Sequence, residues 1–406
     1  MTPKPRRLLF KANSNRIFIL CERNNFLSLW ALLSSSFIFR FFQMSKLKTP
    51  MLDEFYNCQQ FIDFKLHNLS RPIIGDIIYT ASLKLFKSDS YANLSAMNDT
   101  TSFSIFPYYI YIRWQNIILS SFIPPIITAT LLLTGCPLFV STAAGFLIAF
   151  EFGSIIRSRM ICVDPLFNFL IAISIFLRTL LQFDVSQTFV FLYVFTSSFS
   201  SVIDYSGFVI LFGELLIFVF HKRRNIRVLF LIFSFVILFQ VCDLCLEKYF
   251  INNLNFSELI SQKLQHLISL KFRRIKIYTF PLWKFIPRLL WSTENQQIYL
   301  FNNPVVILFS TLFCAFGIRK RLSIFYFLSI WFIWLLKRPT SVLDYQISLF
   351  FSAISIGQLL QNFPFRNICS FIMLLLLALA FSLWAPWIYG LKISPQMNSI
   401  LNIWDI

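Results

Sequence analysis

The sequence predicts an all-α polytopic membrane protein whose helices cross a bilayer about eleven times. The first observation behind this prediction is composition: 57% of the 406 residues are hydrophobic, only 13% are charged, and 52 are phenylalanine. An ordinary soluble domain is about 45–50% apolar and about 25% charged. The second observation is that no polar or Gly/Ser-rich linker divides the chain, so apolar residues extend from end to end. A membrane bundle fits this pattern, and a soluble enzyme does not.

The individual spans are predicted from the apolar segments in chain order. A helix needs about 20 mainly apolar residues to cross the hydrocarbon core of a bilayer. Some segments are short, the second contains Pro124 and Pro125, and only a few residues around Asp204 separate the fifth from the sixth. The expected spans are 26–43, 115–133, 137–152, 163–180, 187–202, 205–221, 227–244, 304–318, 322–336, 341–361 and 368–388.

Positive charge in the tails and short loops predicts the orientation. The tail 1–25 carries six lysines and arginines and is expected in the cytosol. With eleven spans, the basic segments 221–224 and 319–321 fall on the same side, and the tail 395–406 falls in the lumen. The short loops with Arg157, Arg159, Lys337 and Arg338 fall opposite, so the rule is obeyed imperfectly. We attribute the net charge of +18 to residues that set the membrane topology and contact lipid headgroups, not to nucleic-acid binding.

The domain organisation follows from these spans. Residues 26–394 form one transmembrane domain between the two tails, with two long luminal loops at 44–114 and 245–303. The first span is expected to remain as a signal anchor, because Arg40 interrupts it and no Ala-x-Ala cleavage site follows. We expect no metal site, because the lone pair Cys242 and Cys245 has neither a second Cys pair nor histidines at zinc spacing.

Ionisable residues at the membrane boundary are the places to look for chemistry, because they are costly there unless they are used. Asp53 and Glu54 follow the first span and could supply a general base, although such a pair is commonly just solvated. Arg113 opens the second span among aromatic residues. It either reaches the interface with its long side chain or binds a lipid phosphate.

Two further polar clusters lie on the same side of the membrane. One runs from Glu151 to Asp164 and contains Arg157 and Arg159, a set of charges that could also be an ion-pair network holding helices together. The other runs from Glu294 to Pro304. There Asn303 is expected to cap a helix whose first turn begins with proline. Together the four clusters indicate a site at the luminal boundary.

The order of these clusters resembles the protein O-mannosyltransferases, a family of GT-C membrane glycosyltransferases. In that family an Asp-Glu pair in the first luminal loop precedes a Phe-Asp-Val-His-Pro-Pro stretch, and an arginine opens the second span. This chain has Asp53-Glu54, then Phe64-Lys-Leu-His67-Asn-Leu69, then Arg113. The two family prolines after His67 are therefore replaced by Asn68 and Leu69.

Three later motifs continue the resemblance, which covers roughly residues 26–394. Ser158-Arg159-Met-Ile-Cys-Val-Asp164 is similar to the family's Ser-Arg-x-x-x-x-Asp segment. Gln297-Ile-Tyr299-Leu-Phe-Asn-Asn303-Pro304-Val305 resembles its Gln-Ile-Tyr-Leu-x-x-Asn-Pro-Val signature, the most specific match. Pro386-Trp-Ile-Tyr389-Gly390-Leu391 resembles its C-terminal Pro-x-x-Tyr-Gly-Leu. Eukaryotic members also carry a β-trefoil MIR domain between spans seven and eight, for which loop 245–303 is too short.

The resemblance implies a GT-C fold and an inverting transfer of mannose from dolichyl phosphate mannose to Ser or Thr hydroxyls of secretory-pathway proteins. It implies Asp53 as the catalytic base and Glu54 as its partner in positioning the acceptor. Arg113 is the first choice for the donor phosphate, with Arg159, Gln297 and Tyr299 as weaker candidates; the supporting residues are His67, Asp164 and Asn303.

The resemblance also implies a multi-pass protein of the endoplasmic reticulum membrane. Its partners would be the lipid-linked donor, acceptor proteins, membrane lipids and a family member in a homo- or heterodimer, with no nucleic acid and no cofactor. Three alternatives stay open: another polyprenyl-phosphate-sugar transferase of the GT-C class, an inactive partner subunit, or a lipid transporter. A transporter would favour charges at mid-span and internal repeats, and neither stands out in the sequence.

Overall fold

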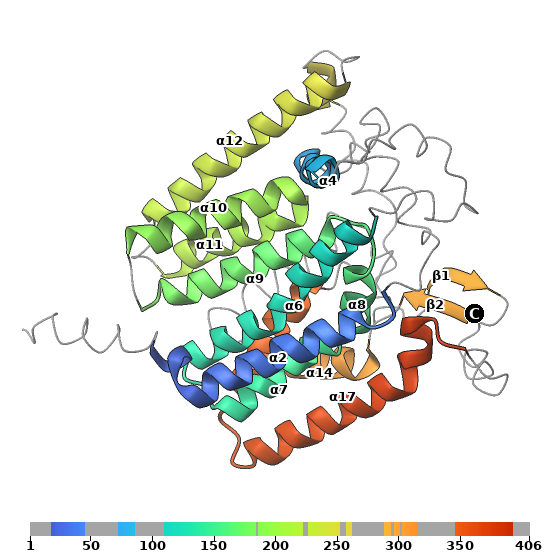
Figure 1. Cartoon of the computed structure of the whole chain (residues 1–406). Helices are drawn as coiled ribbons and strands as arrows, with labels where there is room; N and C mark the ends of the chain where they lie inside the picture. The colour runs from blue at the N-terminus through green and yellow to red at the C-terminus, as the bar shows by residue number, and fades with distance from the viewer. Residues whose placement is uncertain are drawn as a thin grey trace, which may run out of the picture.

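The computed structural model describes residues 18–44, 72–85, 109–183, 186–221, 226–251, 257–261, 288–293, 296–300, 303–314 and 346–392. The regular secondary structure of these residues is helical apart from one small hairpin (Figure 1). The helices are α2 (Arg23–Phe41), α4 (Ile74–Leu85), α6 (Tyr109–Leu133), α7 (Leu138–Ala149), α8 (Phe152–Ser158), α9 (Asp164–Leu180), α10 (Gln187–Ile203), α11 (Phe208–His221), α12 (Ile226–Ile251), α14 (Pro304–Cys314), α16 (Gln346–Leu360) and α17 (Arg366–Tyr389). The strands are β1 (Arg288–Thr293) and β2 (Gln296–Leu300), and the 3-10 turns are Ile19–Cys21 and Tyr205–Gly207.

The apolar helices confirm a multi-pass membrane protein. Within the described residues, three helices are long and apolar enough to cross a bilayer: Arg113–Leu133, Ile226–Phe250 and Arg366–Tyr389. The pair α7 and α8, bent by 59° at a short break, passes the same test as one broken span. A helix lies at each predicted span except 322–336, which is outside the described residues, so the count of eleven stays a prediction.

Different segments of the chain meet at the two ends of the helix bundle. At one end, the Gln361 amide after α16 donates to the Gly135 carbonyl between α6 and α7, at 3.2 Å. At the other end, the Asn303 amide before α14 donates to the Phe150 carbonyl between α7 and α8, at 3.1 Å. This second end also holds β1 and β2 and the C-terminal end of α17 (Figure 1). We call it the hairpin end.

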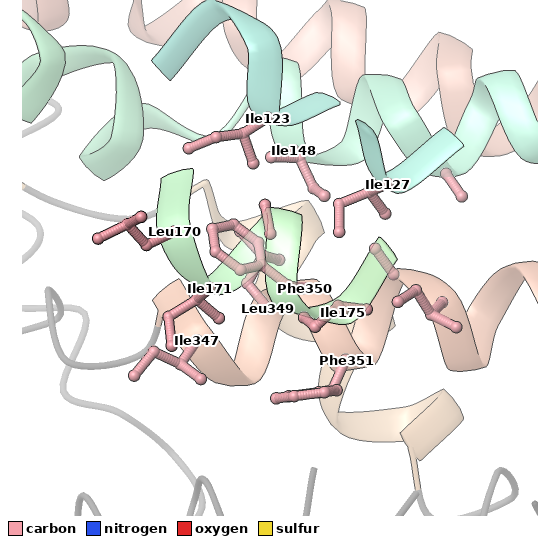
Figure 2. Close-up of a cluster of buried hydrophobic side chains, with 14 of the residues drawn as sticks. Ile123, Ile127, Ile148, Leu170, Ile171, Ile175, Ile347, Leu349, Phe350 and Phe351 are labelled. Atoms are coloured by element: carbon pink, nitrogen blue, oxygen red, sulfur yellow. The ribbon is translucent and has the colours of Figure 1, made fainter. Parts of the chain in front are cut away.

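The core lies between helices that are distant in sequence. Figure 2 shows side chains of α6, α7, α9 and α16 meeting, among them Ile127, Ile148, Ile171 and Phe350. All four are almost completely buried. The outer faces of α2, α12 and α17 carry exposed apolar side chains such as Phe230, as expected where helices contact lipid. Dispersion contacts, rather than expulsion of water, hold such a bundle together.

A buried ion pair joins three helices away from the hairpin end. The Arg178 side chain of α9 donates to both carboxylate oxygens of Glu214 on α11. The Tyr193 hydroxyl on α10 donates to the same carboxylate at 2.7 Å. All three residues are at least nine-tenths buried. Since ionisable groups inside a bilayer persist only when paired, the triad fixes the positions of α9, α10 and α11.

We expect Arg178→Ala to destabilise the protein strongly, because it leaves the Glu214 carboxylate buried without its cation. Breaking a buried pair from one side costs about 3–5 kcal/mol, whereas replacing both charges by apolar groups of similar volume is often neutral. The double variant Arg178→Met, Glu214→Leu should therefore melt closer to the wild type. Thermal unfolding in detergent measures this, with exposed Arg227→Ala as the control. A single variant as stable as this control would show that the pair contributes nothing.

Candidate active site

The first turns of α6 are tied to the segment that precedes α9. Arg113, in the first turns of α6, is fully buried. One turn later, the Asn116 amide donates to the carbonyl oxygens of Met160 at 2.6 Å and Cys162 at 3.1 Å. Residues three apart share a helix face, so Arg113 stands on the side of α6 that faces the Ser158–Asp164 motif. These two parts of the predicted donor site are therefore neighbours.

Arg159 lies in the middle of the hairpin end. Its guanidinium donates to the Ile388 carbonyl at 2.9 Å and to the Gln43 carbonyl at 3.4 Å. It also stacks over the Tyr389 ring, 5.1 Å from the centroid. Gln43 follows α2 and Ile388 is near the end of α17, so Arg159 binds carbonyl groups where two helices end. A cation is favourable there because the helix dipole is negative at that end.

The ion pair in this segment is made by Arg157, one of the charges that the sequence left open as either a site or a network between helices. The Arg157 guanidinium pairs with the carboxylate of Asp164, which opens α9. Both side chains are partly exposed. Asp164 thus supports the segment by fixing its two ends, while Arg159 is left to point toward α17.

The hairpin places the third motif in the same cluster. Gln297 pairs with Ser292 across the antiparallel strands β1 and β2. The next two side chains, Ile298 and Tyr299, are buried in a hydrophobic cluster built from α8, the loop after it, β2 and the end of α17. We call this the hairpin-end cluster; its buried members are Phe152, Ile155, Ile156, Met160, Cys162, Ile298, Tyr299, Trp384, Trp387, Ile388 and Tyr389.

Asn303 caps α14, as the sequence predicts. Its side-chain oxygen accepts from the Val305 backbone N–H at 3.0 Å, and Pro304 is the first residue of the helix. Its amide donates to Phe150 at the break between α7 and α8. The Asn303 backbone N–H also faces the buried carboxylate of Glu151, whose side chain caps α8 by accepting from Gly153. The signature Asn therefore holds α14 against the broken span.

The C-terminal motif ends α17 and closes the cluster. Gly390 has φ +62°, a left-handed conformation that glycine adopts without a Cβ clash, so α17 stops there. The Leu391 N–H donates to the Pro386 carbonyl at 2.9 Å. The Tyr389 hydroxyl donates to the Phe39 carbonyl of α2 at 2.6 Å. This turn therefore aligns α17 with α2 beside Arg159.

Several residues at this end carry contacts that sequence reasoning did not assign. In the sequence, Arg40 only interrupts the first predicted span. It is fully buried and donates to the Ser36 carbonyl and hydroxyl and, at 3.0 Å, to the Ser154 hydroxyl of α8. Asn116 lies inside an apolar run, and a single amide there forms no sequence pattern that would indicate a functional site. Asp53, Glu54 and His67 lie outside the described residues, so their predicted roles stay predictions.

Comparison with known proteins agrees with this arrangement. The sequence profile of the dolichyl-phosphate-mannose-protein mannosyltransferases matches residues 30–260, more than half of the chain. The chain belongs to this family. It is therefore a mannosyltransferase that takes mannose from dolichyl phosphate mannose and transfers it to protein. No curated protein matches the chain significantly over its sequence.

A solved structure extends the likeness to nearly the whole length of the mannosyltransferase. The protein O-mannosyltransferase Pmt1-Pmt2 complex of S. cerevisiae, bound to the sugar donor, matches with a TM-score of 0.76 at 10% sequence identity. The match covers 92% of this chain and 91% of that chain. The predicted GT-C fold is thereby confirmed.

Proposed function

We propose that the mannosyltransferase reaction takes place at the hairpin end, with Asp53 as the base. The observation that carries this proposal is the meeting of three family motifs there: the Ser158–Asp164 segment, Tyr299 on β2 and Tyr389 on α17 contribute to one cluster. These segments are distant in sequence: Asp164 precedes Tyr299 by 135 residues, and Tyr299 precedes Tyr389 by 90. A shared site is the simplest reason for three separate signatures to meet at one place.

The chemistry needs a base and a stabilised leaving group. A Ser or Thr hydroxyl is a weak nucleophile, so Asp53 would accept its proton as the oxygen attacks the anomeric carbon of mannose. The bond between that carbon and the phosphate oxygen breaks, and dolichyl phosphate leaves with the bonding electrons. Glu54 would orient the acceptor or the base. The proposed transfer uses no metal ion and no cofactor other than the lipid-linked donor itself.

The donor phosphate would be bound by Arg113 in the first place. Arg113 is buried and is the first residue of a helical stretch that is long and apolar enough to cross a membrane. There its guanidinium would bind a phosphate through charge-assisted hydrogen bonds. Arg159, within the Ser158–Asp164 segment, would be a second group that binds the phosphate. Gln297 and Tyr299 of β2 would make further contacts. Burial raises the pKa of the Tyr299 hydroxyl, so this group would donate a hydrogen bond as a neutral phenol. His67, Asp164 and Asn303 would support the site.

The partner and the cellular location of the protein are inferred from its family and from the matched solved structure. We infer that the protein pairs with a member of its own family, because the matched yeast structure is a complex of two such proteins. We place it in the endoplasmic reticulum membrane, with secretory proteins as acceptors.

The orientation is tested by reporters at the two termini. With eleven spans and a basic tail 1–25, we expect Met1 in the cytosol and Ile406 in the lumen. Glycosylation or protease-protection tags at the two ends measure this. Both tags on one side would make the number of spans even and would separate the predicted clusters.

The activity itself is tested with the purified chain, dolichyl phosphate mannose and a Ser/Thr-rich peptide. Mannosylated peptide is the expected product. Activity that appears only after a second family member is added, and that survives inactivation of this chain's Asp53, would make the chain a supporting subunit. Transfer of the donor sugar to a lipid instead of the peptide would indicate another GT-C reaction. Movement of the lipid without transfer would indicate a transporter.

A further inference from the structure

An apolar groove lies between α2, α6 and α9. In Figure 1, α2 runs along α6. The groove has a volume of about 300 Å³, which is the size of the smaller ligand pockets in proteins. All the side chains that line it are apolar, among them Phe26, Trp30 and Leu33 of α2, Phe122 and Ala129 of α6, and Phe176 of α9.

The rim of the groove faces outward from the bundle. Phe26, Trp30 and Phe122 are exposed, and the rings of Phe26 and Trp30 meet edge to face with their centroids 6.1 Å apart. Ala129 is buried and contributes only a methyl group, so α6 leaves space at this position. In a bilayer, lipid chains contact the exposed apolar surface of a helix bundle. The groove therefore opens toward lipid.

The groove extends over about one leaflet of the bilayer. A helix rises about 1.5 Å per residue, so the segment from Arg23 to Leu33 covers about 15 Å. Half of a typical hydrocarbon core is also about 15 Å thick. Gln43, which follows α2, is bonded to Arg159 at the hairpin end, so Arg23 lies at the opposite end of the bundle. The length of the groove therefore matches an acyl chain in the leaflet away from the hairpin end.

A cation stands where the groove reaches the membrane surface. Arg23 is exposed in the first turn of α2, and Phe26 and Trp30 follow it by three and seven residues. Residues at these spacings share one face of a helix. The neighbouring Glu22 carboxylate accepts from the Asn25 amide at 3.2 Å, and it is the single acidic residue of the tail 1–25, which carries six lysines and arginines. This end of the groove is therefore suited to an anionic headgroup.

The groove is separate from the proposed donor site. Arg113 precedes Phe122 by nine residues, which is about two and a half helical turns and about 14 Å along α6. Phe122 therefore faces the side of α6 opposite to Arg113. The lipid tail of a donor held at Arg113 would have to pass around α6 to enter the groove.

We propose that the groove binds one acyl chain of an anionic phospholipid whose phosphate pairs with Arg23. Lipid tails are as apolar as the lining of the groove, so the chain alone gains little over its place in the surrounding bilayer. Arg23 supplies the preference for a negative headgroup. The bound chain fills space between α2, α6 and α9 where dispersion contacts are otherwise missing. This inference does not depend on the roles proposed for Asp53 and Arg113.

The headgroup contact is tested with the purified full chain in nanodiscs that contain equal amounts of phosphatidylcholine and phosphatidylserine. Native mass spectrometry measures which lipid stays on the released protein. We expect the wild type to retain phosphatidylserine preferentially and Arg23→Ala to lower this preference roughly fivefold, the contribution of one basic residue near the membrane surface. Arg227→Ala removes another exposed arginine, at the start of α12, and should retain lipid like the wild type.

The chain contact is tested by filling the groove. Leucine is nearly as good a helix former as alanine, so Ala129→Leu adds bulk to the groove without weakening α6 as a helix. We expect this variant to lose the retained phosphatidylserine and the rise in melting temperature that phosphatidylserine gives the wild type over phosphatidylcholine. Ala31→Leu adds the same bulk at an exposed position of α2 outside the groove and should keep both.

Four outcomes would overturn the proposal. One is equal retention of the two lipids by the wild type, and another is an unchanged preference in Arg23→Ala or Ala129→Leu. Displacement of phosphatidylserine by dolichyl phosphate would make the groove part of the donor site. Loss of pairing with a second family member in Ala129→Leu, with lipid retention unchanged, would make the groove a contact between proteins. None of these measurements uses mannose transfer, so failure of the proposed reaction would be recognised separately.

Discussion

Replacing Asp53 by asparagine is expected to lower the rate of mannose transfer by roughly 10²–10⁴-fold, the usual contribution of a positioned acid or base. Asparagine keeps the size and hydrogen-bonding capacity of the side chain but cannot take the proton of the acceptor hydroxyl. Donor affinity should barely change, because a base directed at the acceptor contacts little of the lipid phosphate.

Single-turnover transfer and equilibrium binding of dolichyl phosphate mannose, measured on the same preparation, separate the two effects. Glu54→Gln is the matched variant, since it removes the adjacent carboxylate in the same way. If Asp53→Asn remains fully active, Asp53 has no part in the mechanism, and a large loss in Glu54→Gln would make Glu54 the base.

Removing the side chain of Arg113 should have the opposite effect: donor binding should be lost rather than the rate of transfer. A hydrogen bond to a charged group contributes about 1.5–3 kcal/mol, so Arg113→Ala should weaken donor binding by roughly 10–100-fold. The rate from the saturated donor complex should fall less than in Asp53→Asn. Arg113→Lys keeps the charge but loses the two-pronged geometry of the guanidinium, and an intermediate affinity is expected.

The control is Arg366→Ala, which removes an exposed arginine at the opposite end of the bundle. Its donor affinity should equal that of the wild type. Arg113 is fully buried, so melting temperatures must accompany the binding data to exclude a folding defect. Equal loss of donor binding in Asp53→Asn and Arg113→Ala would contradict the two-role scheme and would make the two residues a structural ion pair.

Local patterns predict much of this molecule because a bilayer constrains helices locally. Every backbone group of a spanning segment must be bonded within its own helix, so long apolar runs become helices whatever they pack against. The spans near 115–133, 227–244 and 368–388 are found as α6, α12 and α17. The Asn303 cap before Pro304 was also predictable, since its contacts lie within two residues.

The arrangement of the site depended on contacts that no local pattern contains. The sequence predicted that the Ser158–Asp164 segment and Tyr299 lie at one membrane boundary, but not that they pack in one cluster with Trp387. The Ser158–Asp164 segment and Tyr299 are more than a hundred residues apart along the chain, and only the packing of α8, β2 and α17 brings them together. Motif order in the sequence indicated a common site without its geometry.

By itself, the sequence determined the fold class, the positions of the long helices and the family, because hydropathy and motif spacing are properties of continuous segments. Tertiary structure alone decided the pairings. In the folded chain Asp164 pairs with Arg157, Arg159 binds the Ile388 carbonyl at the end of α17, and Arg178 on α9 pairs with Glu214 on α11. Gly75 of α4 also lies against Val163. Such contacts depend on the register and rotation of packed helices, which are fixed by shape complementarity between distant surfaces rather than by the order of residues in either one.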